Sequence, residues 1–85
     1  MNKKNKIDRI YEILIQYEHL KNKEPNITEV SYKNYIDRLS VWYLGYGNEE
    51  IACSLKGLHK LGLEASHETV KRIVFHIINI IDKEG

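Results

Sequence analysis

The apolar residues of this chain recur at helical spacing, and the pattern is interrupted at one proline and three glycines. The breaks fall at Pro25, Gly45, Gly47 and Gly62. The stretches between them cover about residues 7–23, 29–44, 48–61 and 66–83. Apolar residues at positions i, i+3, i+4 and i+7 share one face of a helix, which can then pack against a core. The sequence therefore predicts an all-α fold, a small bundle of amphipathic helices.

The predicted helix starts carry residues suited to capping. Asn48 precedes Glu49 and Glu50, so its side chain can accept from free backbone N–H groups while the two acids suit the positive end of the helix dipole. Ser66 opens the last stretch in the same way. The candidate caps of the second stretch are Asn26, Thr28 and Ser31. These signals support helix starts at the predicted positions.

Length, charge and cysteine content limit the classes of protein to which this chain can belong. Its 85 residues allow one small domain, and 42% hydrophobic residues are enough for a single core. Thirteen Lys and Arg against twelve Asp and Glu leave a net charge of +1, which excludes a strongly basic, histone-like nucleic-acid binder. A single Cys excludes an intramolecular disulfide framework and favours a cytoplasmic protein.

The chain shows no sequence signal for a membrane or for export. Its most apolar stretch, residues 73–81, is interrupted by His76 and Asn79 and is far shorter than the ~20 residues that cross a bilayer. The N-terminal segment MNKKNK lacks the apolar core of a signal peptide, and we expect it to be a solvated, frayed end. We therefore expect no membrane association.

The four predicted helices divide into a core and one further helix. We expect residues 1–85 to form a single helix-turn-helix domain, with a tri-helical core over 29–85 and an N-terminal helix within 1–24. Small Ala52 is placed where two helices of such a core would cross at a steep angle. The N-terminal helix and the isoleucine-rich end of the last helix carry more apolar surface than one small domain readily hides. A homodimer would bury this surface, so a second copy of the chain is an expected partner.

The last predicted helix presents a polar face that fits the major groove of DNA. This face carries His67, Glu68, Lys71, Arg72 and Phe75. A helix of this kind places its first turns against base edges, and its Lys and Arg side chains bind phosphates or guanine. Lys56 and Lys60, on the outer face of the preceding helix, are expected to contact phosphates. Double-stranded DNA is therefore the expected partner.

These residues also have structural interpretations. Glu68 suits the first turn of a helix through the helix dipole, and the basic residues fit an ordinary solvated surface. Phe75 is unusual on a polar face, and packing against the N-terminal helix or a second subunit is favoured over contact with a thymine methyl group. The histidines and Cys53 lack the spacing of a metal site, so we expect no metal and no other cofactor.

Four short motifs lie between Trp42 and His76. They are Trp42-Tyr43-Leu44, Glu50-Ile51-Ala52, Leu61-Gly62-Leu63 and Ser66-His67-Glu68-Thr69-Val70-Lys71-Arg72. Together they resemble the N-terminal helix-turn-helix domain of insertion-sequence transposases, and more weakly LuxR-type regulators and the C-terminal domains of sigma factors. The resemblance covers about half of the chain and implies a DNA-binding domain. The connection between Ala52 and Ser66 is longer than in these families.

Two hypotheses about function follow. The first is a small sequence-specific DNA-binding protein, a transcriptional regulator from a mobile element, phage or plasmid, acting as a homodimer with residues 66–83 in the major groove. The second is a protein-interaction module on the same scaffold, which binds and inhibits another protein with Phe75 as an anchor. Neither hypothesis is an enzyme, because the resemblance is to a DNA-binding domain and no catalytic motif accompanies it.

Overall fold

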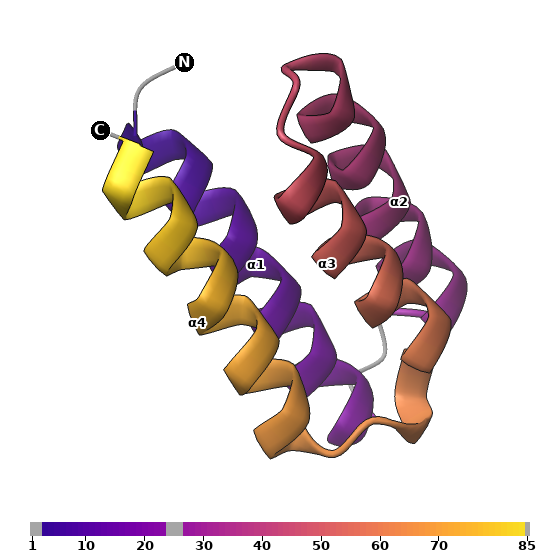
Figure 1. The fold of residues 1–85 in the computed structure, drawn as a ribbon. Helices are drawn as coiled ribbons and strands as arrows, with labels where there is room; N and C mark the ends of the chain where they lie inside the picture. Colours follow the sequence, from indigo (N-terminus) through magenta and orange to yellow (C-terminus); the bar gives the residue numbers. More distant parts are fainter. Residues whose placement is uncertain (1–2, 24–26, 85) are drawn as a thin grey trace.

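A computed structural model describes residues 3–23 and 27–84, and every regular element within these ranges is a helix (Figure 1). The elements are α1 (Lys3–Lys21), α2 (Glu29–Gly45), α3 (Glu49–Leu61), the short 3-10 helix η1 (Gly62–Glu64) and α4 (His67–Glu84). The predicted all-α fold is confirmed. α1 begins at Lys3, so the expected frayed N-terminus is helical from that residue onward. Pro25 and Asn26, predicted as a helix break and a candidate cap, lie outside the described residues.

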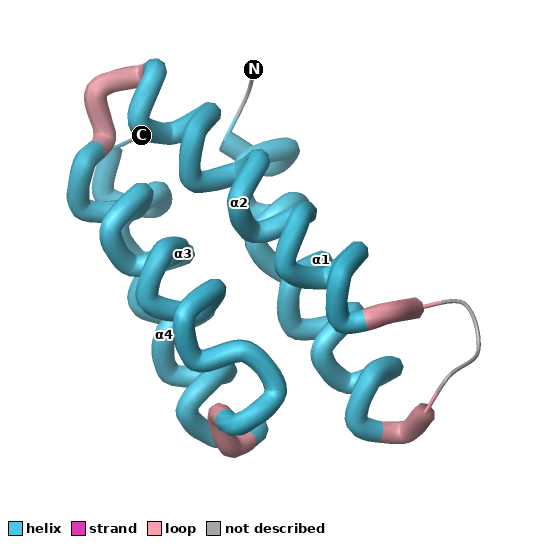
Figure 2. Tube along the Cα trace, turned by 90° about the vertical axis from the view of Figure 1, so that its right-hand side faces the viewer, coloured by secondary structure: helices cyan, strands magenta, loops and turns pink. Residues whose placement is uncertain are grey.

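Consecutive helices run in opposite directions and form a bundle that measures 36 × 21 × 18 Å (Figure 1). α2 and α3 lie side by side as a hairpin (Figure 2). α1 lies beside α4, although these two helices come from opposite ends of the described chain. α1 packs against α4 more extensively than α3 does. The N-terminal helix therefore shares a single core with the other three helices of the described chain.

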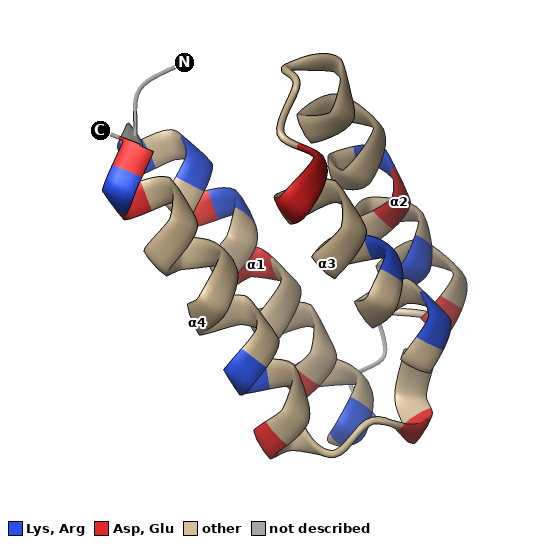
Figure 3. Ribbon diagram, viewed as in Figure 1, with Lys and Arg blue, Asp and Glu red and all other residues tan. Residues whose placement is uncertain are grey.

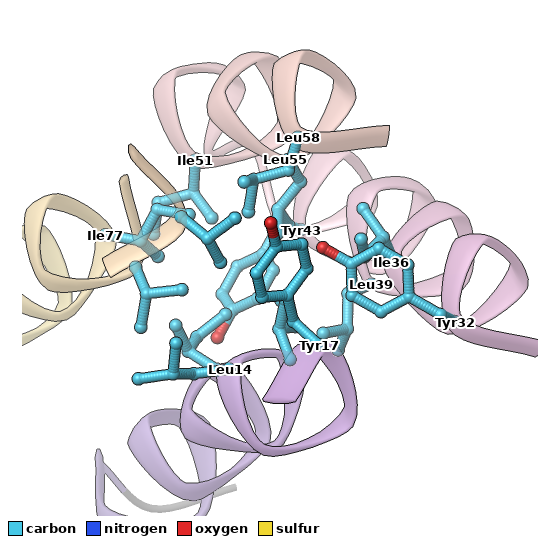
Figure 4. Close-up of a cluster of buried hydrophobic side chains, with 14 of the residues drawn as sticks. Leu14, Tyr17, Tyr32, Ile36, Leu39, Tyr43, Ile51, Leu55, Leu58 and Ile77 are labelled. Carbon is cyan, nitrogen blue, oxygen red and sulfur yellow. The ribbon is translucent and has the colours of Figure 1, made fainter. Parts of the chain in front are cut away.

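The core lies where the apolar faces of the helices meet (Figure 4). Its buried members are Ile10, Ile13, Leu14, Tyr17, Tyr32, Ile36, Leu39, Tyr43, Ile51, Leu55, Leu58, Ala65, Val70, Val74, Ile77 and Ile81. Full burial of one large aliphatic side chain contributes about 1.5–3 kcal/mol. Ile77 and Ile81 belong to the isoleucine-rich end of α4, and α1 helps to cover them. Much of the apolar surface that favoured a dimer is therefore buried within one chain.

Small residues let α2 and α3 approach each other closely. Ser40 is buried on α2, and its hydroxyl donates a hydrogen bond to the backbone carbonyl of Ala52 at 3.1 Å. A larger side chain at position 52 would push this carbonyl away from Ser40. The close helix approach expected at Ala52 is present, but α2 and α3 lie side by side there and do not cross at a steep angle (Figures 1 and 2).

Side-chain caps fix the starts of α2, α3 and α4. The capping residues are Thr28, Asn48 and Ser66. The Thr28 hydroxyl oxygen accepts from the backbone N–H of Ser31 at 3.0 Å. In the reverse direction, the backbone N–H of Thr28 donates to the Ser31 hydroxyl oxygen at 3.1 Å. Ser66 accepts from the backbone N–H of Thr69 at 3.1 Å. The caps predicted at Asn48 and Ser66 are confirmed, and Thr28 is the cap among the three candidates for α2.

Asn48 joins the start of α3 to the end of α4. Its Oδ1 accepts from the backbone N–H of Ile51 at 3.2 Å, and its Nδ2 donates to a carboxylate oxygen of Glu84. We expect Asn48→Ala to lower the free energy of unfolding by about 1 kcal/mol, the usual contribution of such a cap. Urea denaturation followed by circular dichroism measures this loss. Asn34→Ala, at an exposed position on α2, is the control and should change the value by less than about 0.5 kcal/mol. Equal losses in the two variants would contradict the role of Asn48.

Candidate functional site on α1 and α4

α4 turns one face into the core and leaves the predicted site residues on its other side. The buried face carries Val70, Val74, Ile77 and Ile81. The exposed residues include His67, Glu68, Lys71, Arg72 and Phe75. Spacings of three and four residues keep each set on its own side of the helix. The basic pair Lys71 and Arg72 is therefore accessible to a partner.

His67 and Glu68 begin α4 and have structural roles there. The Nε2 atom of His67 lies 2.9 Å from a carboxylate oxygen of Glu18 on α1. The His67 ring also stacks on Tyr17, with the centroids 5.8 Å apart and the planes at 8°. Glu68 occupies the first turn, where the helix dipole favours an acid. Both side chains remain exposed, but the contacts of His67 attach it to α1.

Phe75 lies against the first helix, as the packing alternative predicted. Its ring meets the ring of Tyr11 edge-on, with the centroids 6.1 Å apart and the planes at 78°. Both side chains remain partly exposed, Phe75 at 45% and Tyr11 at 38%. Ile15, one turn after Tyr11 on α1, is 44% exposed. Tyr11, Ile15 and Phe75 form an apolar surface across the two helices, which we call the α1–α4 patch.

Basic residues lie beside the α1–α4 patch. Lys71 and Arg72 precede Phe75 by four and three residues, so they lie about one turn nearer the start of α4. Between Arg72 and Asp82 the sequence contains no Lys, Arg, Asp or Glu. The middle of α4 is correspondingly uncharged in Figure 3. The patch thus combines an apolar centre with a cationic border on one side.

The two lysines expected to contact phosphates lie elsewhere. Lys60 borders a hollow that is also lined by Glu29 and Lys33 at the start of α2. Lys56 is one turn earlier on α3 and shares this side of the helix. The side of α3 that faces α4 carries Glu50, whose carboxylate lies 3.6 Å from a histidine of α4. The structure therefore does not bring Lys56 and Lys60 together with the basic pair of α4.

A second surface feature, between α1 and α2, was not predicted. A hollow of about 530 Å³ is lined by Arg9, Tyr35, Arg38, Leu39 and Trp42. Its two arginines come from different helices. The spacing of apolar residues along a sequence predicts helices but does not show which of them become neighbours, so the hollow could not be predicted. The α1–α4 patch was missed in part for a related reason. A helix as apolar as α1 gives no signal for which of its apolar residues stay exposed.

Other kinds of site find little support in the described residues. Within the described ranges, no three side chains of His, Cys, Asp or Glu gather as a metal site requires. Cys53 is exposed and carries a free thiol. No helix in the part of the chain that the structure describes is long and apolar enough to span a bilayer.

Comparison with known proteins adds no assignment. No family model matches the chain, and no curated protein or solved structure is significantly similar to it. The comparisons therefore identify neither a helix-turn-helix domain nor a transposase. A function must therefore be inferred from the surface of the molecule itself, beginning with the α1–α4 patch and the charges beside it.

Proposed function

We propose that this chain binds another protein through the α1–α4 patch, with Phe75 as the central anchor. The observation that carries the proposal is the joint exposure of Tyr11, Ile15 and Phe75 on two packed helices. Single exposed apolar residues are common on protein surfaces, whereas neighbouring exposed apolar residues on two packed helices offer a surface that a partner can bury. An aromatic side chain that enters a pocket of the partner supplies a large share of the binding energy.

Lys71 and Arg72 indicate the chemistry of the partner. They border the apolar patch on the α4 side, so a complementary surface has an apolar hollow with carboxylates beside it. The carboxylate of Glu18 on α1 is already engaged by His67. The net charge of +1 gives the whole molecule little general attraction for nucleic acid. A protein with an acidic rim around an apolar pocket is therefore the partner that fits best.

The affinity of the purified chain for its purified partner tests the role of Phe75 as the anchor. A photo-crosslinking residue at position 75 first identifies the partner, and calorimetry then measures the dissociation constant. Phe75→Asp should weaken binding at least about 30-fold, because a hot-spot residue contributes about 2 kcal/mol or more. The variant should keep the circular dichroism spectrum of the wild type, since position 75 is half exposed.

Val30→Asp is the matched control for this experiment. Val30 is 68% exposed in the first turn of α2 and does not belong to the α1–α4 patch. Its replacement should change the affinity by less than about threefold, the range of an ordinary surface substitution. The proposal would be wrong if Phe75→Asp bound the partner as the wild type does, or if both variants lost affinity equally.

DNA binding by α4 is a second candidate function, favoured by the exposure of Lys71 and Arg72. A helix capped at Ser66 with an accessible basic pair in its first half is what the resemblance implies for a recognition helix. In this hypothesis the chain is a regulator that forms a homodimer and places residues 66–83 in the major groove of each half-site. Glu68 and the separate location of the α3 lysines make this candidate weaker.

Fluorescence anisotropy with labelled duplex DNA over a salt series tests the second candidate. It predicts binding at low salt that falls steeply as salt rises, because phosphate contacts release counterions. Replacing Lys71 and Arg72 together by Gln should abolish this binding without changing the circular dichroism spectrum. Absence of binding at low salt would exclude DNA as the partner and would leave the protein-binding proposal in place.

A further inference from the structure

The hollow between α1 and α2 combines two guanidinium groups with aromatic walls. Tyr35, Arg38, Leu39 and Trp42 lie within about two turns on one side of α2, and Arg9 faces them from α1. Its volume of about 530 Å³ is within the range of small-molecule sites. The hollow lies on the α2 side of α1, whereas the α1–α4 patch lies on the α4 side. It is therefore a separate site.

Contacts within the hollow hold its parts in place. The Tyr35 hydroxyl donates a hydrogen bond to the backbone carbonyl of Arg9 at 2.9 Å. The Arg9 guanidinium lies over the Trp42 ring, 5.3 Å from its centroid, in a cation–π arrangement. Tyr43 and Tyr46 meet the Trp42 ring edge-on, each with its centroid 4.9 Å away. A ligand would therefore find the aromatic wall and one of the cations already positioned.

Neither guanidinium group forms an ion pair with a carboxylate of the described residues. Burial and the Glu12 carboxylate raise the pKa of Tyr35 above its usual value, and the smaller effects of Arg9 and Arg38 lower it. Two guanidinium groups that line one hollow and are free of ion pairs with the described residues are a site for an anion with several oxygens.

We propose that this hollow binds an aromatic phosphate monoester of the size of a nucleoside monophosphate. The phosphate oxygens accept hydrogen bonds from Arg9 and Arg38, since planar guanidinium groups match the spacing of phosphate oxygens. The double negative charge of the monoester matches the two cations. The aromatic body packs against the apolar wall formed by Leu39 and Trp42.

NMR titration tests the site directly. Trp42 is the single tryptophan of the chain, so one indole N–H signal reports on the hollow. Adenosine monophosphate should move this signal along a saturable curve with a dissociation constant of about 1 mM or lower. Adenosine and inorganic phosphate, added separately, should each bind at least about tenfold more weakly, because each lacks half of the contacts.

Two variants remove the cations one at a time. Arg38→Gln and Arg9→Gln should each weaken binding of adenosine monophosphate about tenfold or more, the effect of losing a charge-assisted hydrogen bond. Lys83→Gln removes a positive charge at the exposed end of α4 and should leave the affinity unchanged. The proposal is overturned if the Trp42 signal does not saturate, if adenosine binds as well as its monophosphate, or if Arg38→Gln binds like the wild type.

Discussion

Replacing Tyr17 by alanine should remove a large part of the free energy of unfolding of this protein. Tyr17 is fully buried, and its ring lies 5.9 Å from the ring of Tyr32 and 5.8 Å from that of His67. Its hydroxyl donates a hydrogen bond to the backbone carbonyl of Ala65, just before α4. Loss of a large buried aromatic side chain costs about 3–5 kcal/mol. A domain of 85 residues has a total stability of about 4–13 kcal/mol, so this loss is a large part of it.

Urea denaturation of three variants separates the ring of Tyr17 from its hydroxyl. Tyr17→Phe keeps the ring and should cost about 1–2 kcal/mol, because the carbonyl of Ala65 loses a buried partner. Tyr46→Ala removes an aromatic side chain that is 68% exposed and should cost less than about 1 kcal/mol. If Tyr17→Ala lowered the free energy of unfolding no more than Tyr46→Ala does, the described packing of α1 against the start of α4 would be contradicted.

Raising the pH above 10 should destabilise the protein steeply. Burial, with a smaller contribution from the Glu84 carboxylate, raises the pKa of Tyr43 from 10.0 to about 12, and burial also raises the pKa of Tyr32. Above pH 10 the phenols of Tyr32 and Tyr43 lose their protons in the unfolded chain, whereas in the folded protein both phenols stay protonated. The unfolded state then binds fewer protons, so the free energy of unfolding falls as pH rises. Two such groups together approach a slope of about 2.7 kcal/mol per pH unit.

Urea denaturation between about pH 9 and pH 12 measures this slope. The double variant Tyr32→Phe, Tyr43→Phe removes both groups and should lose most of the pH dependence. The two substitutions should cost little at neutral pH, because neither hydroxyl has a hydrogen-bond partner among the described residues. All other ionisable groups are common to the two proteins, so the difference between their pH profiles isolates the two buried phenols. A double variant as sensitive to alkali as the wild type would contradict their burial.

The helices and their ends could be predicted because their signals are local. Asn48 and Ser66 each accept a hydrogen bond from the residue three positions later. Gly62 ends α3 with φ at +55°, a conformation that favours glycine. These features depend on neighbours in the sequence. The exposure of Lys71 and Arg72 could be predicted for the same reason, because it follows from the period of a single helix.

Contacts between helices could not be predicted, because they depend on which helices become neighbours. The His67–Glu18 contact requires α4 to lie beside α1, and nothing in either segment states this. The sequence left open whether Phe75 packs on the first helix or on a second subunit, and the structure shows its ring in contact with Tyr11 of the first helix. Periodicity showed that the N-terminal helix and the last helix carry much apolar surface. It did not show that α1 and α4 bury part of this surface against each other, and so it favoured a dimer.

NMR chemical-shift mapping is the most direct test of protein binding by the α1–α4 patch. The isotope-labelled chain is titrated with the purified partner and, separately, with duplex DNA. We predict that the partner shifts the amides around Tyr11, Ile15 and Phe75, while those of the α2–α3 hairpin stay in place. Shifts centred on the hairpin, or α4 shifts that appear with DNA and not with the partner, would contradict this prediction.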